Sequence, residues 1–381
     1  MKTYFVTGST GVLGSAVVEA LLKDPSSRLR LLIRAPSQDV LQSRLRELLT
    51  YCAVDANAIS DRVTPLAGDA TQPRFGMPEE IYRDVVQECT HAIHCAGAVR
   101  MNLPIEEARR SAVGSARNLL RFAEDVSKVS GTAPKIEFVS TVGVGGRFPG
   151  SVPERWIDES RSFHNTYEQA KAEAEEVVKG AIDDGMPVTV HRPSMIVGSS
   201  TSGKVFNFQV FYHLAEFLSG RRTFGLFPQL GSATLDLVAS NRVADAIVWS
   251  STSPIATGRI LHLCAGPGGA IDLPSLREIV RTAYRRHGLD VPNIHDLPTV
   301  IFRALTVMVG FVSDRRTRRA LSTLPVFLDY LSDGQTFDNA RTRELLSGAG
   351  LDLDRSDVLV EPILDFYLDA KHSGDPASRR R

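Results

Sequence analysis

Residues 3–22 read TYFVTGSTGVLGSAVVEALL. The first five form an apolar run that predicts a buried strand, and the residues from Val12 onward have the pattern of a helix. Three glycines at a spacing of three and three lie between them. Glycine permits a tight turn and a close approach of the backbone to a pyrophosphate, which then faces the positive end of the helix. The sequence therefore predicts a dinucleotide phosphate site made by Gly8, Ser9, Thr10, Gly11, Val12, Leu13 and Gly14.

Short apolar runs alternate with longer amphipathic segments through the first two thirds of the chain. This alternation predicts parallel strands joined by helices, and runs such as LRLLIR and KIEFVS are apolar enough to be buried on both faces. We expect an α/β fold with a Rossmann-like, doubly wound parallel sheet. The predicted strands are Thr3–Thr7, Leu29–Arg34, Arg62–Ala67, His91–Cys95, Lys135–Ser140, Pro187–His191 and Arg259–Cys264, with a further strand-like run at Thr234–Val238.

The domain organisation follows from where this alternation stops. Residues 1–271 are expected to form the nucleotide-binding domain, with 192–240 contributing to the substrate site. Residues 272–372 are expected to form a smaller, mainly helical substrate-binding or lid region, and 373–381 a disordered tail. In the helical region an apolar run, Val300–Val312, precedes a cationic cluster. This cluster consists of Arg315, Arg316, Arg318 and Arg319. An apolar segment next to a cationic one suits a hydrophobic acyl chain attached to an anionic carrier. The alternative is that the apolar run belongs to the core and the arginines form a solvated helix face.

The composition narrows the class of protein. The 44 basic residues balance the 44 acidic ones, which gives no indication of nucleic-acid binding. Neither the four cysteines nor His91, His94 and His191 have metal-ligand spacing, so we expect no metal site and a reduced, cytoplasmic protein. The longest apolar stretch, Leu297–Val312, is shorter than the roughly 20 residues of a transmembrane helix and contains Pro298 and Arg303.

The second predicted strand ends on Arg34 rather than on an acid. An acid there would hold the ribose hydroxyls of NAD, whereas an arginine can pair with the 2′-phosphate of NADP, and Arg44 on the next helix can assist. The sequence therefore favours NADP (NADPH), the alternative being a solvated arginine at a strand end. Other residues follow strands at the edge where ligands bind in such sheets: Asp69, expected to bond the adenine amino group, Ala70, Cys95, Ala96 and Gly97.

Tyr167 and Lys171 lie four residues apart in the helical segment YEQAKAEAEEVVKG, so both project from one helix face. A neighbouring ammonium is expected to lower the pKa of the phenol and suit it to proton transfer. Thr141 ends the fifth strand and can hydrogen-bond a substrate carbonyl. A Tyr-x-x-x-Lys pair alone is more often a surface pair. Its position after the glycine-rich turn and a hydroxyl at a strand end predicts a catalytic group.

With these motifs the chain resembles the extended short-chain dehydrogenase/reductase family, and within it the fatty acyl-CoA reductases and thioester reductase domains of the male-sterility type. The matching stretches are TGSTGVLG, GDATQPRFGM, IHCAGAVRMNL, FVSTVGVGG, YEQAKAEAE, HRPSMIVG and LDLVASNRVADAI, which together span roughly residues 1–264. The resemblance implies that Thr141, Tyr167 and Lys171 are catalytic and that Pro193 and Ser194 lie beside the nicotinamide. One position departs from the family: Ser111 stands where an asparagine usually helps to hold a lysine-linked water of the proton relay.

The resemblance implies an NADPH-dependent reduction of an acyl thioester, carried by coenzyme A or a carrier protein, to an aldehyde. Whether a second hydride then gives the alcohol is left open. Two alternatives stay open. One is a ketone or alcohol oxidoreductase, or an epimerase, acting on a sterol-, flavonol- or sugar-nucleotide-like substrate with the same catalytic group. The other is a non-catalytic NADP-binding sensor or scaffold.

Overall fold

The computed structural model describes residues 1–229, 231, 233–298, 302 and 334–373. Its centre is a seven-stranded sheet in the order β12-β7-β5-β4-β1-β2-β3, with every pairing parallel. The doubly wound fold predicted from the sequence is confirmed. The strands are β1 (Lys2–Thr7), β2 (Ser27–Ile33), β3 (Val63–Ala67), β4 (His91–His94), β5 (Lys135–Val139), β7 (Val188–Pro193) and β12 (Ile260–Leu263).

Helices cover both faces of this sheet. One face packs against α1 (Val12–Leu22), α2 (Gln38–Tyr51) and α8 (Ser240–Thr252), through one apolar cluster. The other face packs against α3 (Glu79–Glu88), α5 (Ser115–Ser130) and α6 (Thr166–Asp183), through a second cluster. Strand order reverses between β1 and β4, so the crevice at the carboxyl ends of these two strands is where a ligand is expected to bind.

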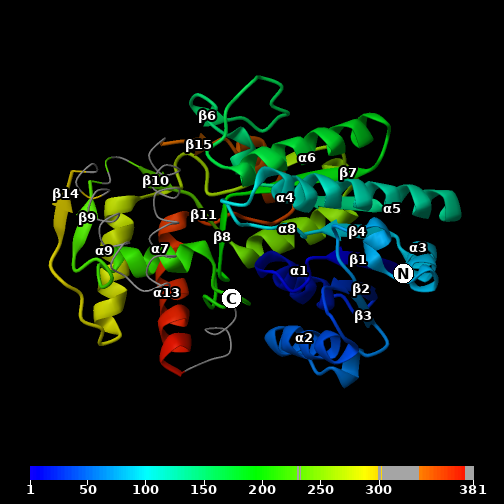
Figure 1. Ribbon diagram of the computed structural model, residues 1–381, viewed down its shortest axis with the longest axis horizontal. Helices are drawn as coiled ribbons and strands as arrows, with labels where there is room; N and C mark the ends of the chain where they lie inside the picture. The colour runs from blue at the N-terminus through cyan, green and yellow to red at the C-terminus, as the bar shows by residue number, and fades with distance from the viewer. Residues whose placement is uncertain (230, 232, 299–301, 303–333, 374–381) are drawn as a thin grey trace.

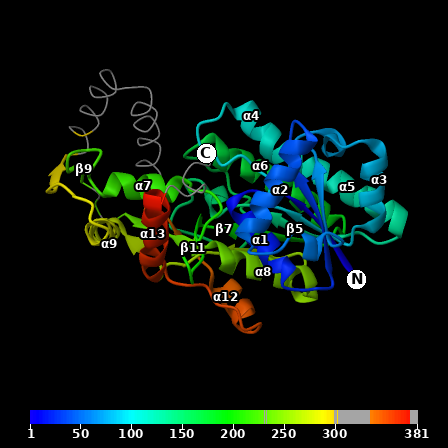
Figure 2. The ribbon, with the colours of Figure 1, turned by 90° about the horizontal axis from the view of Figure 1, so that it is seen from below.

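A second region lies beside the sheet, on the left of Figure 1, and Figure 2 shows the same separation from below. Its apolar core joins α7 (Val210–Leu218), α9 (Leu273–Arg286) and α13 (Ser356–Ser373). Short strands border it: β8 (Met195–Val197) pairs with β11 (Leu237–Ala239), β9 (Leu226–Pro228) with β14 (His295–Leu297), and β10 (Thr234–Leu235) with β13 (Ile271–Asp272).

The chain after residue 333 returns to the sheet domain before it forms α13. Strand β15 (Thr336–Phe337) pairs with β6 (Ser151–Val152), and α12 (Ala340–Ser347) packs near β12. Leu346 and Leu353 lie in the same apolar cluster as α1 and α8. The region after 272 is therefore less uniformly helical than the sequence indicated, because this return pairs strands and buries side chains on the sheet domain. The boundary at 271/272 stays a prediction.

Several short helices complete the described chain. Four are 3-10 turns, namely η1 (Asn57–Ile59), η2 (Pro73–Gly76), η4 (Val142–Gly145) and η5 (Pro254–Ala256). Helix α4 (Ile105–Arg109) runs into a π-helical turn, η3 (Arg110–Gly114), which continues as α5. Such π-turns interrupt the regular hydrogen bonding of a helix and frequently occur at functional sites.

Candidate active site

The glycine-rich turn leaves no room for a Cβ atom at Gly8 or Gly14, and Gly8 also has a positive φ. Gly8 has φ of 70°, and a Cβ there would lie 2.6 Å from the backbone nitrogen of Ala96 at the end of β4. A Cβ on Gly14 would lie 2.0 Å from the carbonyl oxygen of Gly8. Gly11 is the N-cap of α1, so the helix begins with free backbone N–H groups at the crevice. The turn thus has the shape and the dipole that a dinucleotide pyrophosphate requires.

The residues expected at the adenosine end gather at the ends of β2 and β3. The Arg34 side chain is 77% exposed, with Nη1 4.0 Å from Oδ2 of Asp69. Arg44 donates a hydrogen bond to the backbone carbonyl of Arg34 and so fixes the strand end that presents it. Asp69 Oδ1 accepts 2.9 Å hydrogen bonds from both the N–H and the hydroxyl of Thr71. The Ala70 carbonyl accepts one of 2.9 Å from Asn118.

A strained turn that the sequence did not reveal holds Asp69. Arg74 and Phe75 both have positive φ, 50° and 59°, an unfavourable conformation for residues with a Cβ. Phe75 is fully buried against Phe5 and Phe122, and its carbonyl accepts the Asp69 N–H at 2.8 Å. Burial of the aromatic ring therefore offsets the backbone strain and fixes the position of the aspartate.

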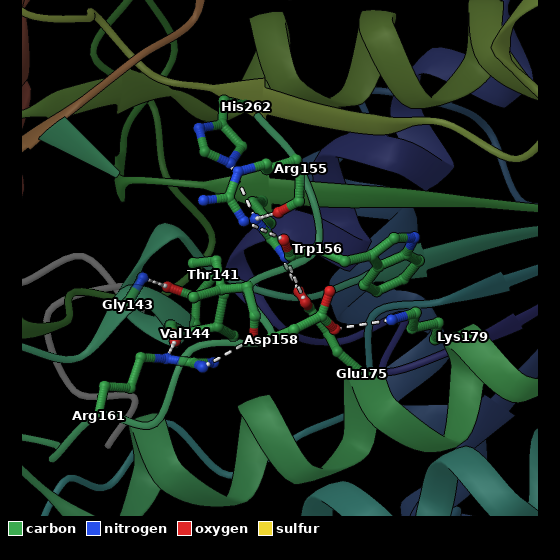
Figure 3. Close-up of polar contacts among 12 residues, drawn as sticks. Thr141, Gly143, Val144, Arg155, Trp156, Asp158, Arg161, Glu175, Lys179 and His262 are labelled. Carbon is green, nitrogen blue, oxygen red and sulfur yellow. Dashed lines mark hydrogen bonds and ion pairs between the residues drawn. The ribbon is translucent and has the colours of Figure 1, made fainter. Parts of the chain in front are cut away.

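The three residues predicted to be catalytic meet at the carboxyl end of β5. Thr141 caps η4, where its Oγ1 accepts the Gly143 N–H at 3.1 Å (Figure 3), and its side chain also hydrogen-bonds Tyr167. Lys171 is buried and donates from Nζ to the Val139 carbonyl at 2.9 Å. Tyr167 and Lys171 thus lie on one face of α6, toward the sheet edge that ends in Thr141.

Burial changes the proton affinities of this group. It raises the pKa of Tyr167 to about 12, although the hydrogen bond from Thr141 acts in the opposite direction. The expectation of a lowered pKa for this phenol was wrong, because desolvation of the phenolate outweighs the stabilisation that the Lys171 ammonium offers it. Burial also lowers the pKa of Lys171 to about 8, against the attraction of the Glu175 carboxylate. Tyr167 therefore remains a proton donor at physiological pH.

The segment after β4 borders the Lys171 ammonium. The Cys95 N–H donates to the Thr7 carbonyl at 3.1 Å, and a Cβ on Gly97 would lie 3.4 Å from Lys171 Nζ. Ser111, the position that departs from the family, lies in the π-turn η3, and its Oγ accepts the Ala98 N–H at 2.9 Å. This hydroxyl therefore anchors the backbone beside Lys171.

The start of α6 is fixed by residues that were not singled out from the sequence. Asn165 caps the helix by accepting the Glu168 N–H at 3.0 Å, and the buried Glu168 carboxylate accepts from the N–H and ring of His164 at 3.0 and 2.9 Å. The Thr166 hydroxyl donates to the Leu103 carbonyl at 2.8 Å. The pattern Asn-Thr-Tyr-Glu is a recognisable capping box, so this signal was present in the sequence.

Pro193 ends β7, and the next residue, Ser194, donates its N–H to the Leu263 carbonyl at 3.1 Å. Asp236 lies close by and interrupts the single strand predicted over Thr234–Val238. Its carboxylate accepts the N–H groups of Ala265 and Gly266 at 2.8 and 2.9 Å, while burial raises its pKa to about 6. This buried acid ties the turn after β12 to the strands beside Ser194.

Other predictions concern the rest of the chain. Val300–Val312 and the arginines at 315, 316, 318 and 319 lie outside the described residues, apart from the buried Phe302. Among the residues that the structure describes, no helix combines the length and apolar character of a membrane span, and no cluster of His, Cys, Asp and Glu has the makeup of a metal site.

Comparison with known proteins gives a family and a set of related structures. The family model for male sterility protein, an NAD-binding family, matches residues 6–247. A non-canonical nonribosomal peptide synthetase, FrzA of a Cladobotryum species, is 27% identical over 269 residues, which are 68% of this chain and 26% of that protein. This chain thus spans about a quarter of that relative.

Two solved structures share the fold along nearly the whole chain. The terminal R domain of the myxalamid biosynthetic pathway superposes with a TM-score of 0.80 at 26% identity, covering 98% of this chain and 91% of that one. The reductase (R) domain of a nonribosomal peptide synthetase from Mycobacterium tuberculosis gives 0.74 at 22% identity, covering 98% and 92%. The resemblance expected from the sequence motifs is confirmed.

Proposed function

Because the chain belongs to the male sterility protein family, we propose that it is an NADPH-dependent reductase that converts an acyl thioester into an aldehyde. The observation that carries the proposal is the convergence of a hydroxyl, a phenol and an ammonium at the carboxyl end of β5, next to the crevice that begins at Gly8. The names of its relatives, reductase domains of peptide and polyketide synthases, support a thioester as the substrate.

NADPH, held by the glycine-rich turn and by Arg34, would supply the hydride. Thr141 and Tyr167 orient the substrate carbonyl by hydrogen bonds, and these bonds strengthen as negative charge develops on its oxygen. Tyr167 then gives that oxygen its proton, for which a phenol with a pKa of about 12 is in the correct form. The Lys171 ammonium supports the transfer by stabilising the phenolate that remains.

Addition of one hydride and one proton to the thioester carbonyl gives a hemithioacetal. Cleavage of its carbon–sulfur bond releases the thiol of the carrier and leaves an aldehyde, so the thioester is reduced by two electrons. The same three side chains can act on the aldehyde carbonyl, which makes a second reduction to the alcohol chemically accessible at this site.

The proposal includes NADP over NAD, a carrier-linked substrate and a cytoplasmic location. Arg34 is 77% exposed and forms a long, 4.0 Å ion pair with Asp69, so its guanidinium can also pair with a 2′-phosphate. Cys52, Cys89, Cys95 and Cys264 are free thiols, as expected in a reducing compartment. Either coenzyme A or a carrier protein would present the acyl group on a phosphopantetheine thiol.

The test is a comparison of substrate classes. Purified protein is incubated with NADPH and an acyl-CoA, an acyl carrier protein thioester, a ketone or a sugar nucleotide, and both NADPH consumption and products are measured. We expect aldehyde and free thiol from a thioester, and at least a hundredfold slower reaction with Tyr167→Phe. Turnover of ketones or sugar nucleotides without thioester reduction would refute the proposal.

A further inference from the structure

A buried ion pair joins the catalytic helix to the sheet directly behind the proposed active site. Arg192 on β7 is 1% exposed, and its Nε and Nη2 donate to the two carboxylate oxygens of Glu175 on α6 at 2.9 and 2.6 Å. Its Nη1 donates to the Arg155 carbonyl at 3.0 Å and to Nε2 of His262 at 3.2 Å. Figure 3 labels the three partners of this guanidinium, Glu175, Arg155 and His262.

The hydrogen bonds of His262 fix the direction of the network. Its Nδ1 lies 2.7 Å from the Asp338 carbonyl, an acceptor, so Nδ1 carries the proton and Nε2 accepts from Arg192. Burial lowers the pKa of His262 to about 3, so the ring is neutral. The network therefore contains one positive and one negative group, with Arg192 on the sheet side and Glu175 on α6.

Glu175 follows Lys171 by one helical turn, as Lys171 follows Tyr167, and side chains four residues apart lie on the same helix face. All three belong to the face of α6 that points toward the sheet. The negative end of the ion pair thus lies next to Lys171 along this face. Its attraction raises the pKa of Lys171 against the effect of burial.

Among the described residues, the other groups that interact with Lys171 are neutral at physiological pH. Burial raises the pKa of the Cys95 thiol at the end of β4 to about 12, and that of Tyr167 to about 12. Burial also lowers the pKa of His94 to about 3, and the repulsion between its charged ring and Lys171 acts in the same direction. Strand β5 contributes the Val139 carbonyl and the Phe138 ring, which lies 5.6 Å from Nζ. The negative charge beside Lys171 in the described chain is therefore the one on Glu175.

We propose that Glu175 is a positioning residue of the active site: held in place by Arg192, its carboxylate keeps the Lys171 side chain in the ammonium form. The inference rests on the proposed function for the importance of that ammonium. The charge relation itself can be measured in the protein without substrate.

The experiment is an NMR titration of the 381-residue protein carrying 13C at the lysine ε positions. The Lys171 signal is assigned by its loss in Lys171→Met, and its midpoint is compared in wild type, Glu175→Gln and Glu175→Gln/Arg192→Met. We expect Glu175→Gln to lower the midpoint by about one pH unit, a tenfold change in the protonation equilibrium, because it leaves the arginine charge unbalanced. The double variant should fall between Glu175→Gln and wild type.

A Glu175→Gln midpoint within about 0.2 pH units of wild type overturns the inference, since one pH unit is a tenfold effect. If Glu175→Gln does not fold, the double variant provides the test, because replacing both members of a buried pair is often tolerated. A Lys171 midpoint in the double variant equal to that of wild type then overturns the inference. The alkaline limb of kcat/KM with a thioester is measured in parallel. If the Lys171 titration midpoint shifts in Glu175→Gln but the alkaline limb of kcat/KM does not, Glu175 controls the charge of Lys171, and the proposed role of Lys171 in the reaction is refuted.

Discussion

The rate of thioester reduction should fall as pH rises above about 8, and the cause should be Lys171. Its pKa of about 8 means that the ammonium fraction decreases from roughly nine tenths at pH 7 to roughly one tenth at pH 9. Tyr167, with a pKa of about 12, stays protonated over this range. A reaction that needs both groups protonated should therefore lose roughly tenfold in kcat/KM between pH 7 and pH 9.

Initial rates of NADPH consumption with saturating cofactor and low acyl-CoA provide the measurement, with circular dichroism at each pH to verify folding. Lys171→Arg is the matched control, because its guanidinium stays charged throughout. Its rate should be lower than wild type but nearly flat from pH 7 to 9. A wild-type rate that stays constant or rises between pH 7 and 9 would refute the requirement for the Lys171 ammonium.

Three further predictions follow from the site and the core. Tyr167→Phe should reduce kcat at least a hundredfold while changing the Kd for NADPH less than threefold, because the phenol acts on the carbonyl; a tenfold or smaller loss of kcat, measured by product formation, would contradict its role as acid. Arg34→Asp should weaken NADPH relative to NADH by roughly ten- to a hundredfold in fluorescence titrations, the effect of one charge-assisted contact, and equal wild-type affinities would contradict the NADP assignment. Buried His94 and His262, with pKa values near 3 against an ordinary 6.5, contribute stability that is fully present above pH 6.5 and is lost as pH falls toward 3. Asp236, whose pKa is raised to about 6, opposes this loss, and His91, whose pKa is lowered to about 4, adds to it. Urea unfolding should therefore show a net loss of about 3–4 kcal/mol from pH 7 to pH 5; equal stability at the two pH values would contradict the assignment.

The strands of the sheet could be predicted because each one is marked by the residues of its own short segment. Each strand is a short run rich in apolar residues between turn residues, so the seven predicted runs match the seven strands to within about two residues. That Thr141, Tyr167 and Lys171 lie close together could be predicted because the carboxyl ends of parallel strands, and the starts of the helices that follow them, meet at one edge.

Pairings that depend on tertiary contact left no such signal. Glu175 is one of four glutamates within nine residues of α6, and nothing in the local pattern indicates that it faces Arg192. Asp236 looked like an ordinary member of a strand, yet it turns inward to accept two backbone N–H groups from the turn after β12. The roles of Glu175 and Asp236 become visible only through their hydrogen-bond partners, which are distant in the sequence.

The direction of the proton transfer follows from how burial acts on the two key groups. Desolvation favours the neutral form of each, so it raises the pKa of Tyr167 and lowers that of Lys171. The first change suits reduction of a carbonyl, because a neutral phenol can give up its proton. The second does not, because a neutral amine cannot stabilise the resulting phenolate. A dry site with this pair therefore requires a nearby negative charge, and the Glu175 carboxylate, one turn along the same helix and held by Arg192, fulfils that requirement.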